Sequence, residues 1–155
     1  MSNPNVNLGE FWPVMKEVIE SGGEFTFTPN GVSMLPLIRP GVDQVTLVKV
    51  TEKPKVGDAV FYLRDNGQFV LHRIIEIENG EYTMCGDNQF FLEKGITDKH
   101  ILAKMKALIR DGQIIDDTNP KYQKYIKGLK MRRAKKRVRN LLGRIKRKIF
   151  KKKTV

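Results

Sequence analysis

Three short polar stretches of the sequence contain a serine, a histidine and a carboxylate that could act together. Ser33 lies in GVSMLP, His72 in VLHR and Asp87 in CGDN. A serine hydroxyl is a weak nucleophile near neutral pH unless a base takes its proton, and a third polar group must hold that base in one tautomer. The three residue types therefore match the needs of nucleophilic acyl transfer, a chemistry for which we expect no metal and no cofactor.

Each of these residues also has a purely structural interpretation. A serine beside a glycine is typical of a turn, a histidine between apolar residues is typical of a hydrogen-bonded core position, and Gly-Asp-Asn is itself a turn sequence. The catalytic interpretation therefore depends on the combination of the three stretches and on their order and spacing along the chain.

Four stretches resemble, in this order, the successive boxes of the type I signal peptidase family: GVSMLPLI, KVGDAVFY, VLHRIIEI and CGDN. The resemblance covers residues 25–105. It is strongest to the archaeal and endoplasmic-reticulum branch, in which a histidine replaces the general-base lysine, because His72 stands in that box. The resemblance implies a serine endopeptidase that cleaves a leader or precursor peptide through an acyl-enzyme, with Ser33 as nucleophile, His72 as general base and Asp87 as the carboxylate.

The sequence departs from the family pattern at two positions of the expected site. Gly31 stands two residues before Ser33, where signal peptidases usually have a serine that donates to the oxyanion hole, and a glycine here is similar to the self-cleaving repressor family. Glu93 stands where a second aspartate is usual, six residues after Asp87. Either Asp87 or Glu93 could orient His72, and Asp98 is a third candidate. We expect Gly31, Ser33 and Met34 to line the oxyanion and substrate-binding site.

The hydrophobic pattern predicts the elements that must position these residues. Helical spacing favours a short helix over residues 10–20, and β-type runs follow it, with Asn66-Gly67 and Asn79-Gly80 as hairpin turns. These turns predict a three-stranded meander, and residues 101–109 are interpreted as a further strand. We expect a mainly β fold, a small antiparallel domain of packed sheets or a partial barrel. The expected division is an N-terminal helix packed on the body (1–23), a catalytic β-domain (24–117) and a basic helical tail (118–155).

The charge of the chain is divided sharply at Pro120. Residues 1–120 carry 12 basic and 17 acidic side chains, a net of −5, whereas residues 121–155 carry 17 basic side chains and no acidic one. Thr118 or Asn119 can cap a helix there, with Pro120 in its first turn. We therefore expect one amphipathic helix of about 30 residues, with apolar residues at intervals of three and four on a basic surface.

We expect a peptide or protein substrate with a leader segment as one partner. The composition of the tail indicates further partners. A narrow apolar stripe among lysines and arginines is typical of a helix that lies on an anionic membrane, and residues 121–153 would make that contact. Nucleic acid is a less favoured partner, because the tail has few aromatic residues for base stacking. Docking on a protein partner or on the body is a further alternative.

Compartment and activity follow from the remaining features. The N-terminal residues match no secretory signal, and the chain has one cysteine, Cys85, so we expect a cytoplasmic protein, peripherally attached to the inner face of the membrane, with no anchor before the serine box and a buried, inert thiol. The rival hypothesis is a catalytically inactive binding module that keeps the peptidase fold and is recruited to membrane or nucleic acid by its tail.

Overall fold

The protein is mainly antiparallel β-structure with three helices in the described part of the chain. The computed structural model describes residues 8–151, without the side chains of residues 8, 136, 137, 140 and 144–151. The helices are α1 (Leu8–Glu20), α2 (Pro120–Lys127) and α3 (Leu129–Lys151), and η1 (Asp98–His100) is a 3-10 turn. The strands are β1 (Phe25–Phe27), β2 (Gln44–Val48), β3 (Ala59–Leu63), β4 (Phe69–Glu78), β5 (Glu81–Cys85), β6 (Glu93–Ile96), β7 (Ile101–Arg110) and β8 (Gln113–Asp116).

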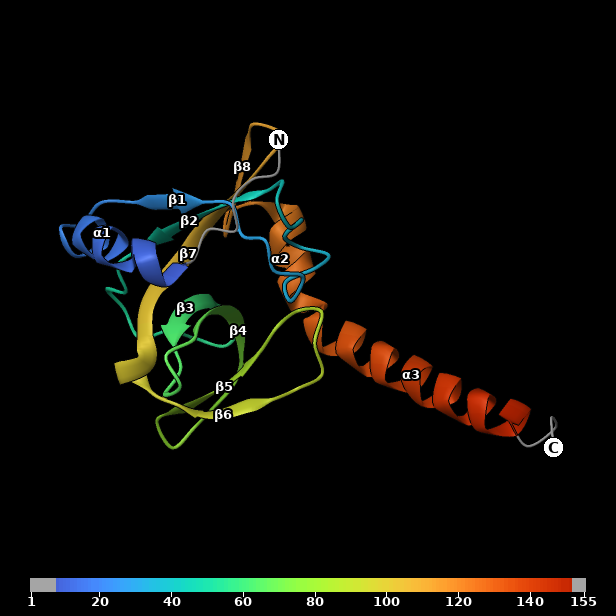
Figure 1. Cartoon of the computed structure of the whole chain (residues 1–155). Coiled ribbons are helices and arrows are strands. Elements are labelled where there is room, and N and C mark those ends of the chain that lie inside the picture. The colour runs from blue at the N-terminus through green and yellow to red at the C-terminus, as the bar shows by residue number, and fades with distance from the viewer. Residues whose placement is uncertain (1–7, 152–155) are drawn as a thin grey trace.

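All eight strands belong to one sheet, which is strongly bent but open (Figure 1). The order is β1-β2-β7-β3-β4-β5-β6, and β8 pairs with residues 107–110 of β7, across that strand from β2. The prediction of a mainly antiparallel β fold is confirmed, but packed sheets are not formed, because the long strand β7 pairs with both β2 and β3 and so joins the two halves into one sheet.

The predicted meander is confirmed as β3, β4 and β5. At the β4–β5 turn, Asn79 and Gly80 both have positive φ, at 51° and 81°, which is the geometry that an Asn-Gly pair favours in a two-residue hairpin. At the β3–β4 turn only Gly67 has positive φ, and the side chain of Asn66 accepts from the Gln68 amide. The predicted strand at residues 101–109 is also confirmed, as β7.

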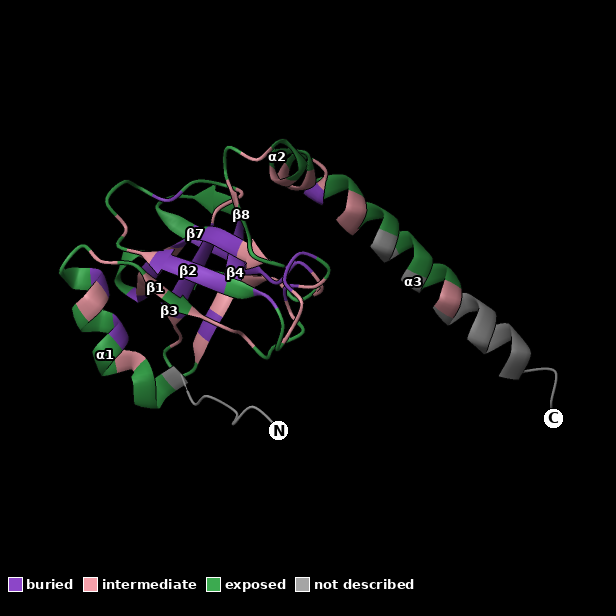
Figure 2. Cartoon of the chain, turned by 90° about the horizontal axis from the view of Figure 1, so that it is seen from above, coloured by how far each residue is buried: buried purple, intermediate pink, exposed green. Residues whose placement is uncertain are grey.

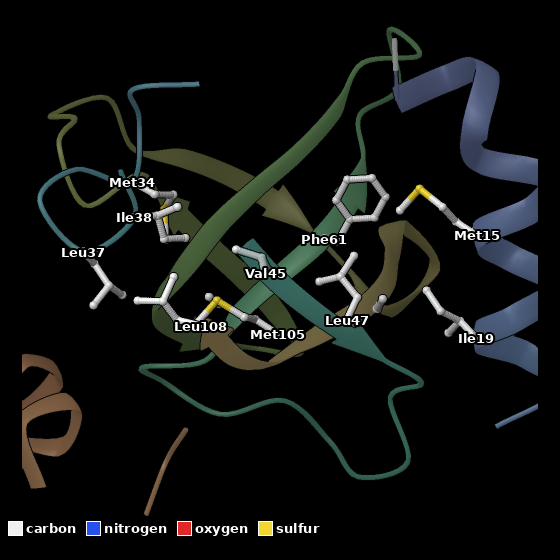
Figure 3. Packing of buried hydrophobic residues seen from close by; sticks show 12 residues of the cluster. Met15, Ile19, Met34, Leu37, Ile38, Val45, Leu47, Phe61, Met105 and Leu108 are labelled. Carbon is white, nitrogen blue, oxygen red and sulfur yellow. The ribbon is translucent and has the colours of Figure 1, made fainter. Parts of the chain in front are cut away.

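The sheet is buried on both faces, which explains the continuous apolar run of β3. Phe61 belongs to the larger of two clusters, which joins α1 to β2 and β7, and Val60 and Tyr62 belong to the other, which lies against β5 and β6. Figure 3 shows how Met15 and Ile19 of α1 reach into the larger cluster. In Figure 2 the buried residues gather on the central strands, such as β2 and β7.

The C-terminal residues form two helices where the sequence predicts one. Asn119 caps α2 by accepting hydrogen bonds from the amides of Lys121 and Tyr122, at 2.9 and 3.2 Å. The helical run breaks at Gly128, where the guanidinium of Arg132 folds back over the ring of Tyr125, 3.9 Å from its centroid. A side chain at Gly128 would collide with that guanidinium. Consequently α2 packs on the body, and α3 extends away from it (Figure 1).

Candidate active site

Ser33 lies in a compact turn between β1 and β2. The amide of Leu35 donates to the Val32 carbonyl, the amide of Ile38 donates to the Met34 carbonyl, and Leu35–Pro36 is a cis peptide. Met34 and Ile38 are buried in the larger core cluster, so the turn is anchored from below while Ser33 stays partly exposed. The turn thus presents the Ser33 hydroxyl at the surface, above buried residues of the core.

The Gly86-Asp87-Asn88 segment, which follows β5, holds the Ser33 turn from behind. The amide of Asn88 donates to the Ser33 carbonyl at 2.8 Å, and its side-chain amide donates to the Val32 carbonyl at 3.1 Å. Gly86 packs so closely that a Cβ there would lie 2.7 Å from the Ser33 carbonyl oxygen. Only glycine therefore fits at position 86. The Ser33 turn and the Gly86-Asp87-Asn88 segment, more than fifty residues apart in the chain, form one structural unit.

Asp87 is fixed by a buried ion pair with Arg73, the neighbour of His72 on β4. Nε and Nη2 of Arg73 donate to the two carboxylate oxygens at 2.8 and 2.7 Å, and both side chains are fully buried. The hydroxyl of Tyr125 from α2 donates to the same carboxylate at 3.0 Å. Although burial opposes it, hydrogen bonding and charge from Asp87 raise the pKa of Arg73. We call Asp87, Arg73, Tyr125 and Asn88 the Asp87 cluster.

The Asp87 cluster shows which groups this predicted site carboxylate contacts. The sequence suggests Asp87 as a residue that could orient His72, but its oxygens are engaged by Arg73 and Tyr125, and no hydrogen bond to His72 is present within residues 8–151. Asp87 instead joins the strand that carries His72 to the segment that holds Ser33. Asp98, the third candidate, accepts from the Tyr82 hydroxyl at 2.5 Å and also makes no contact of this kind with His72 in the described chain.

Glu93 is the carboxylate that reaches His72, and it does so through Tyr62. The hydroxyl of Tyr62 donates to Glu93 at 2.7 Å and lies 3.3 Å from Nδ1 of His72. Arg64 donates to both oxygens of Glu93, at 2.7 and 2.6 Å. We call Glu93, Arg64, Tyr62 and His72 the Glu93 cluster. Although burial opposes it, these hydrogen bonds lower the pKa of the Glu93 carboxyl, so it is ionised near neutral pH.

The Glu93 cluster determines the tautomer of His72. An ionised carboxylate only accepts, so the single proton of the Tyr62 hydroxyl is directed at Glu93. The Tyr62 oxygen can then serve His72 only as an acceptor, which requires the imidazole proton on Nδ1. This arrangement leaves Nε2 of His72 with a free lone pair, as a general base requires.

His72 is neutral near pH 7 because of its surroundings. The side chain is 4% exposed, and burial, followed by the positive charge of Arg64, lowers the pKa of His72 from 6.5 to about 4. The charges of Glu93 and Asp87 act in the opposite direction but are outweighed. A neutral imidazole with Nε2 unprotonated is therefore the form present over the physiological range.

Ser33 and His72 line the same cleft, which has a volume of about 350 Å³. Residues 27–31, 33 and 34, which include Gly31 and Met34, form one wall, and residues 68–72 of β4 and its preceding turn form the other. Among the described residues, Ser33 and His72 share this cleft without a hydrogen bond between them.

Gly31 faces open space at the mouth of this cleft. A Cβ at Gly31 would meet nothing within 4 Å, and its φ lies outside the left-handed region. A side chain is therefore compatible with this backbone. The fold would therefore accept the serine that signal peptidases usually have at this position. Its replacement by glycine is a property of this sequence and is not imposed by packing.

The second wall of the cleft offers an unpaired strand edge. Residues 69–72 of β4 pair with β3 on one side, and the pairing of β4 with β5 begins only at Arg73. Within residues 8–151 no strand pairs with the other edge of this stretch, which therefore offers backbone groups to an added strand. Trp12 of α1 supports it, with its ring 5.6 Å from the ring of Phe69.

Four residues of this site are missed by sequence reasoning: Tyr62, Arg64, Arg73 and Tyr125. Tyr62 carries a weak signal, because strand alternation and the Asn66-Gly67 turn place it near His72 on the same face. Arg73 follows His72 in the predicted strand, where a charge is unusual, and therefore signals a buried partner. Arg64 and Tyr125 carry no local signal that would indicate their partners.

Comparison with known proteins adds no family assignment. No model of a known protein family matches the chain, and a search of curated proteins finds no match. Within the described residues, no group of histidine, cysteine and acidic side chains is arranged to hold a metal ion, and Cys85 is buried. A search of the same part of the chain for helices with the length and apolar character of a membrane span finds none.

Proposed function

We propose that this protein is a serine endopeptidase of signal-peptidase type that works by a Ser33–His72 mechanism. The observation that carries the proposal is the shared cleft, in which a partly exposed serine lies across from a neutral histidine whose Nδ1 is engaged by Tyr62. A purely structural histidine at this position would not need a tyrosine, a glutamate and an arginine to fix its tautomer.

The reaction would proceed in two steps. Nε2 of His72 takes the proton of the Ser33 hydroxyl as its oxygen attacks the scissile carbonyl, and His72 then gives that proton to the leaving amine. Water, deprotonated by His72, hydrolyses the acyl-enzyme. Glu93 acts through Tyr62 by stabilising the protonated imidazole, and Asp87 acts as a positioning residue through Arg73 and Asn88. Among the predicted oxyanion residues, the Ser33 amide and the amides beside it are the available donors, since Gly31 has no hydroxyl.

The substrate would be an extended leader or precursor segment added as a strand along residues 69–72 of β4. Small side chains before the cut are what the resemblance to signal peptidases implies, and Met34, Phe69 and Leu71 of the cleft would contact them. Incubation with a peptide library, read by mass spectrometry, tests the activity: we expect cleavage after small residues that is abolished by Ser33→Ala. Cleavage unchanged by Ser33→Ala would refute the proposal.

The rival is a binding module with the same cleft and no turnover. The lack of a hydrogen bond between Ser33 and His72 in the described chain and the lack of a hydroxyl at Gly31 favour it. Binding of a non-hydrolysed peptide by wild type and Ser33→Ala alike, with no products, would support this second candidate.

We further propose that the protein is cytoplasmic and attaches peripherally to the inner face of the membrane through its C-terminal helices. The support is the run of 17 basic residues without an acidic one and the exposure of Met131, Val138, Leu141 and Leu142 on α3. Flotation with vesicles tests this: binding to anionic but not to neutral vesicles is expected, and retention on DNA without flotation would contradict it.

A further inference from the structure

A second cleft, of about 390 Å³, lies where α2 meets α3, behind the Asp87-Asn88 segment. Leu35, Pro36 and Leu129 provide its apolar surface. Four basic side chains from α3 complete it: Arg132, Arg133, Lys135 and Arg139. The cleft does not overlap the Ser33–His72 cleft, although both are built on the Ser33 turn.

The positive charge of this cleft is not neutralised by the described protein. Its one acidic residue, Asp87, is already bonded to Arg73 and Tyr125. None of the four basic residues forms a salt bridge within residues 8–151, and no acidic residue follows Asp117 in the sequence. Four cations around one concave surface create a strong local preference for an anion.

Arg133 supplies a second, independent indication of a ligand. Its Nη2 donates to the Cys85 carbonyl at 3.3 Å, which holds the guanidinium against the body. Its Nε is buried and has no hydrogen-bond partner in the described chain. A buried donor without an acceptor is costly, and because Arg133 lines the cleft, a small shift of its side chain would bring this donor to the oxygen of a bound anion. Arginine donors in a fixed fork suit a phosphate group in particular.

The surface next to the cleft indicates which class of molecule would bear the bound phosphate group. Met131, Val138 and Leu142 recur at intervals of seven and four, so they share one face of α3, and they are 58 to 64% exposed. Lys135, which lines the cleft, lies on the same face, between Met131 and Val138. An anionic cleft ligand beside an exposed apolar stripe matches an amphiphile, with its headgroup in the cleft and its acyl chains along the stripe.

We propose that the cleft between α2 and α3 binds the phosphate of an anionic phospholipid headgroup. This inference rests on the proposed membrane attachment and makes it specific: a defined site, and not only diffuse charge, holds the lipid. It would also orient the body, since the cleft shares the Asp87-Asn88 segment with the Ser33 turn.

Vesicle flotation of the full chain, with two charge-matched variants, tests the site. Lys135→Gln/Arg139→Gln removes two charges from the cleft, and Lys121→Gln/Lys130→Gln removes two exposed charges outside it. With vesicles of phosphatidylcholine and phosphatidylglycerol, we expect the cleft variant to lose about tenfold more affinity than the control, the effect of one charged hydrogen bond. Equal losses in the two variants would overturn the site while leaving diffuse membrane attachment intact.

The NMR signal of the Arg133 Nε–H group identifies the ligand. We expect this signal to shift saturably with a short-chain phosphatidylglycerol, at concentrations where inorganic phosphate leaves it unchanged. An equal response to inorganic phosphate would show a free anion site and contradict the lipid assignment. A cleft variant that loses retention on DNA but keeps its flotation would assign the cleft to nucleic acid and refute the proposal. None of these measurements depends on peptidase activity, so the two proposals can fail separately.

Discussion

The Asp87 cluster and the Glu93 cluster lie on either side of β4 and differ in what they hold. Asp87 forms a fully buried pair with Arg73 and fixes the Ser33 turn through Asn88. Glu93 forms a partly exposed pair with Arg64 and reaches His72 through Tyr62. The two carboxylates therefore have separate contacts, one at the Ser33 turn and one at His72. This separation predicts that changes in the Asp87 cluster affect folding, whereas changes in the Glu93 cluster affect the chemistry.

The largest expected effect is on stability, from Asp87→Asn. This change leaves the buried guanidinium of Arg73 without a counter-charge, and breaking a buried pair in this way costs about 3 to 5 kcal/mol. Urea unfolding measures the loss, with the exposed Asp117→Asn as the control, for which we expect no change. A loss below about 1 kcal/mol, the range of an exposed pair, would contradict the structural role of Asp87.

The next largest effect is the dependence of the free energy of unfolding on pH, which the burial of His72 causes. Because burial lowers the pKa of His72 from 6.5 to about 4, the unfolded chain binds more protons than the folded one between these two values. The free energy of unfolding should therefore rise with pH across this window, by up to about 3 kcal/mol, and level off above it. Unfolding curves at several pH values should show this rise in wild type and in Ser33→Ala. An equal rise in His72→Gln would show that another group causes it.

The third effect is on catalysis, from Tyr62→Phe, which changes the Glu93 cluster and leaves the Asp87 cluster intact. It removes the hydroxyl between His72 and Glu93, so the tautomer of His72 is no longer fixed and the protonated imidazole loses support. We expect kcat to fall about a hundredfold, within the contribution of a general base, with unfolding changed by only about 1 kcal/mol. Tyr82→Phe, which removes a matching hydroxyl bonded to Asp98, is the control and should keep full activity. Equal effects of both changes would mean that Tyr62 is only structural.

The smallest effect concerns the two glycines next to the Ser33 turn. Gly31 has open space around it, whereas a side chain at Gly86 would collide with Ser33. Gly31→Ser can therefore be folded, and its hydroxyl would supply the oxyanion donor that the family pattern has there. We expect kcat to rise by about tenfold, less than the full effect of such a donor, with Gly31→Ala unchanged. A rise of the same size in Gly31→Ala would exclude the hydroxyl as its cause.

The sequence predicts the meander because its turn and strand signals are local, whereas the pairing of Ser33 with His72 comes from the resemblance of four separate stretches to one family and stays a prediction. Asn79-Gly80 specifies a tight hairpin, and the strand pattern around His72 is continuous. The contacts of the carboxylates are not local: Tyr62 and Glu93 are far apart in the chain, and Asp87 meets Arg73 and Tyr125 only after the sheet and α2 have packed. The same holds for the contact of Arg132 with Tyr125 across Gly128, which the apolar spacing of the tail does not reveal.

Labelling of Ser33 by a serine-reactive phosphonate tests the central claim most directly. The account predicts a single adduct on Ser33, detected by intact-protein mass spectrometry. The rate of its formation should rise as the pH passes about 4, the pKa of His72, and should stay level from there toward neutral pH. His72→Ala should abolish the adduct, and Tyr82→Phe should leave it unchanged. Absence of an adduct from the wild type, or an adduct that forms equally fast in His72→Ala, would contradict a Ser33–His72 mechanism.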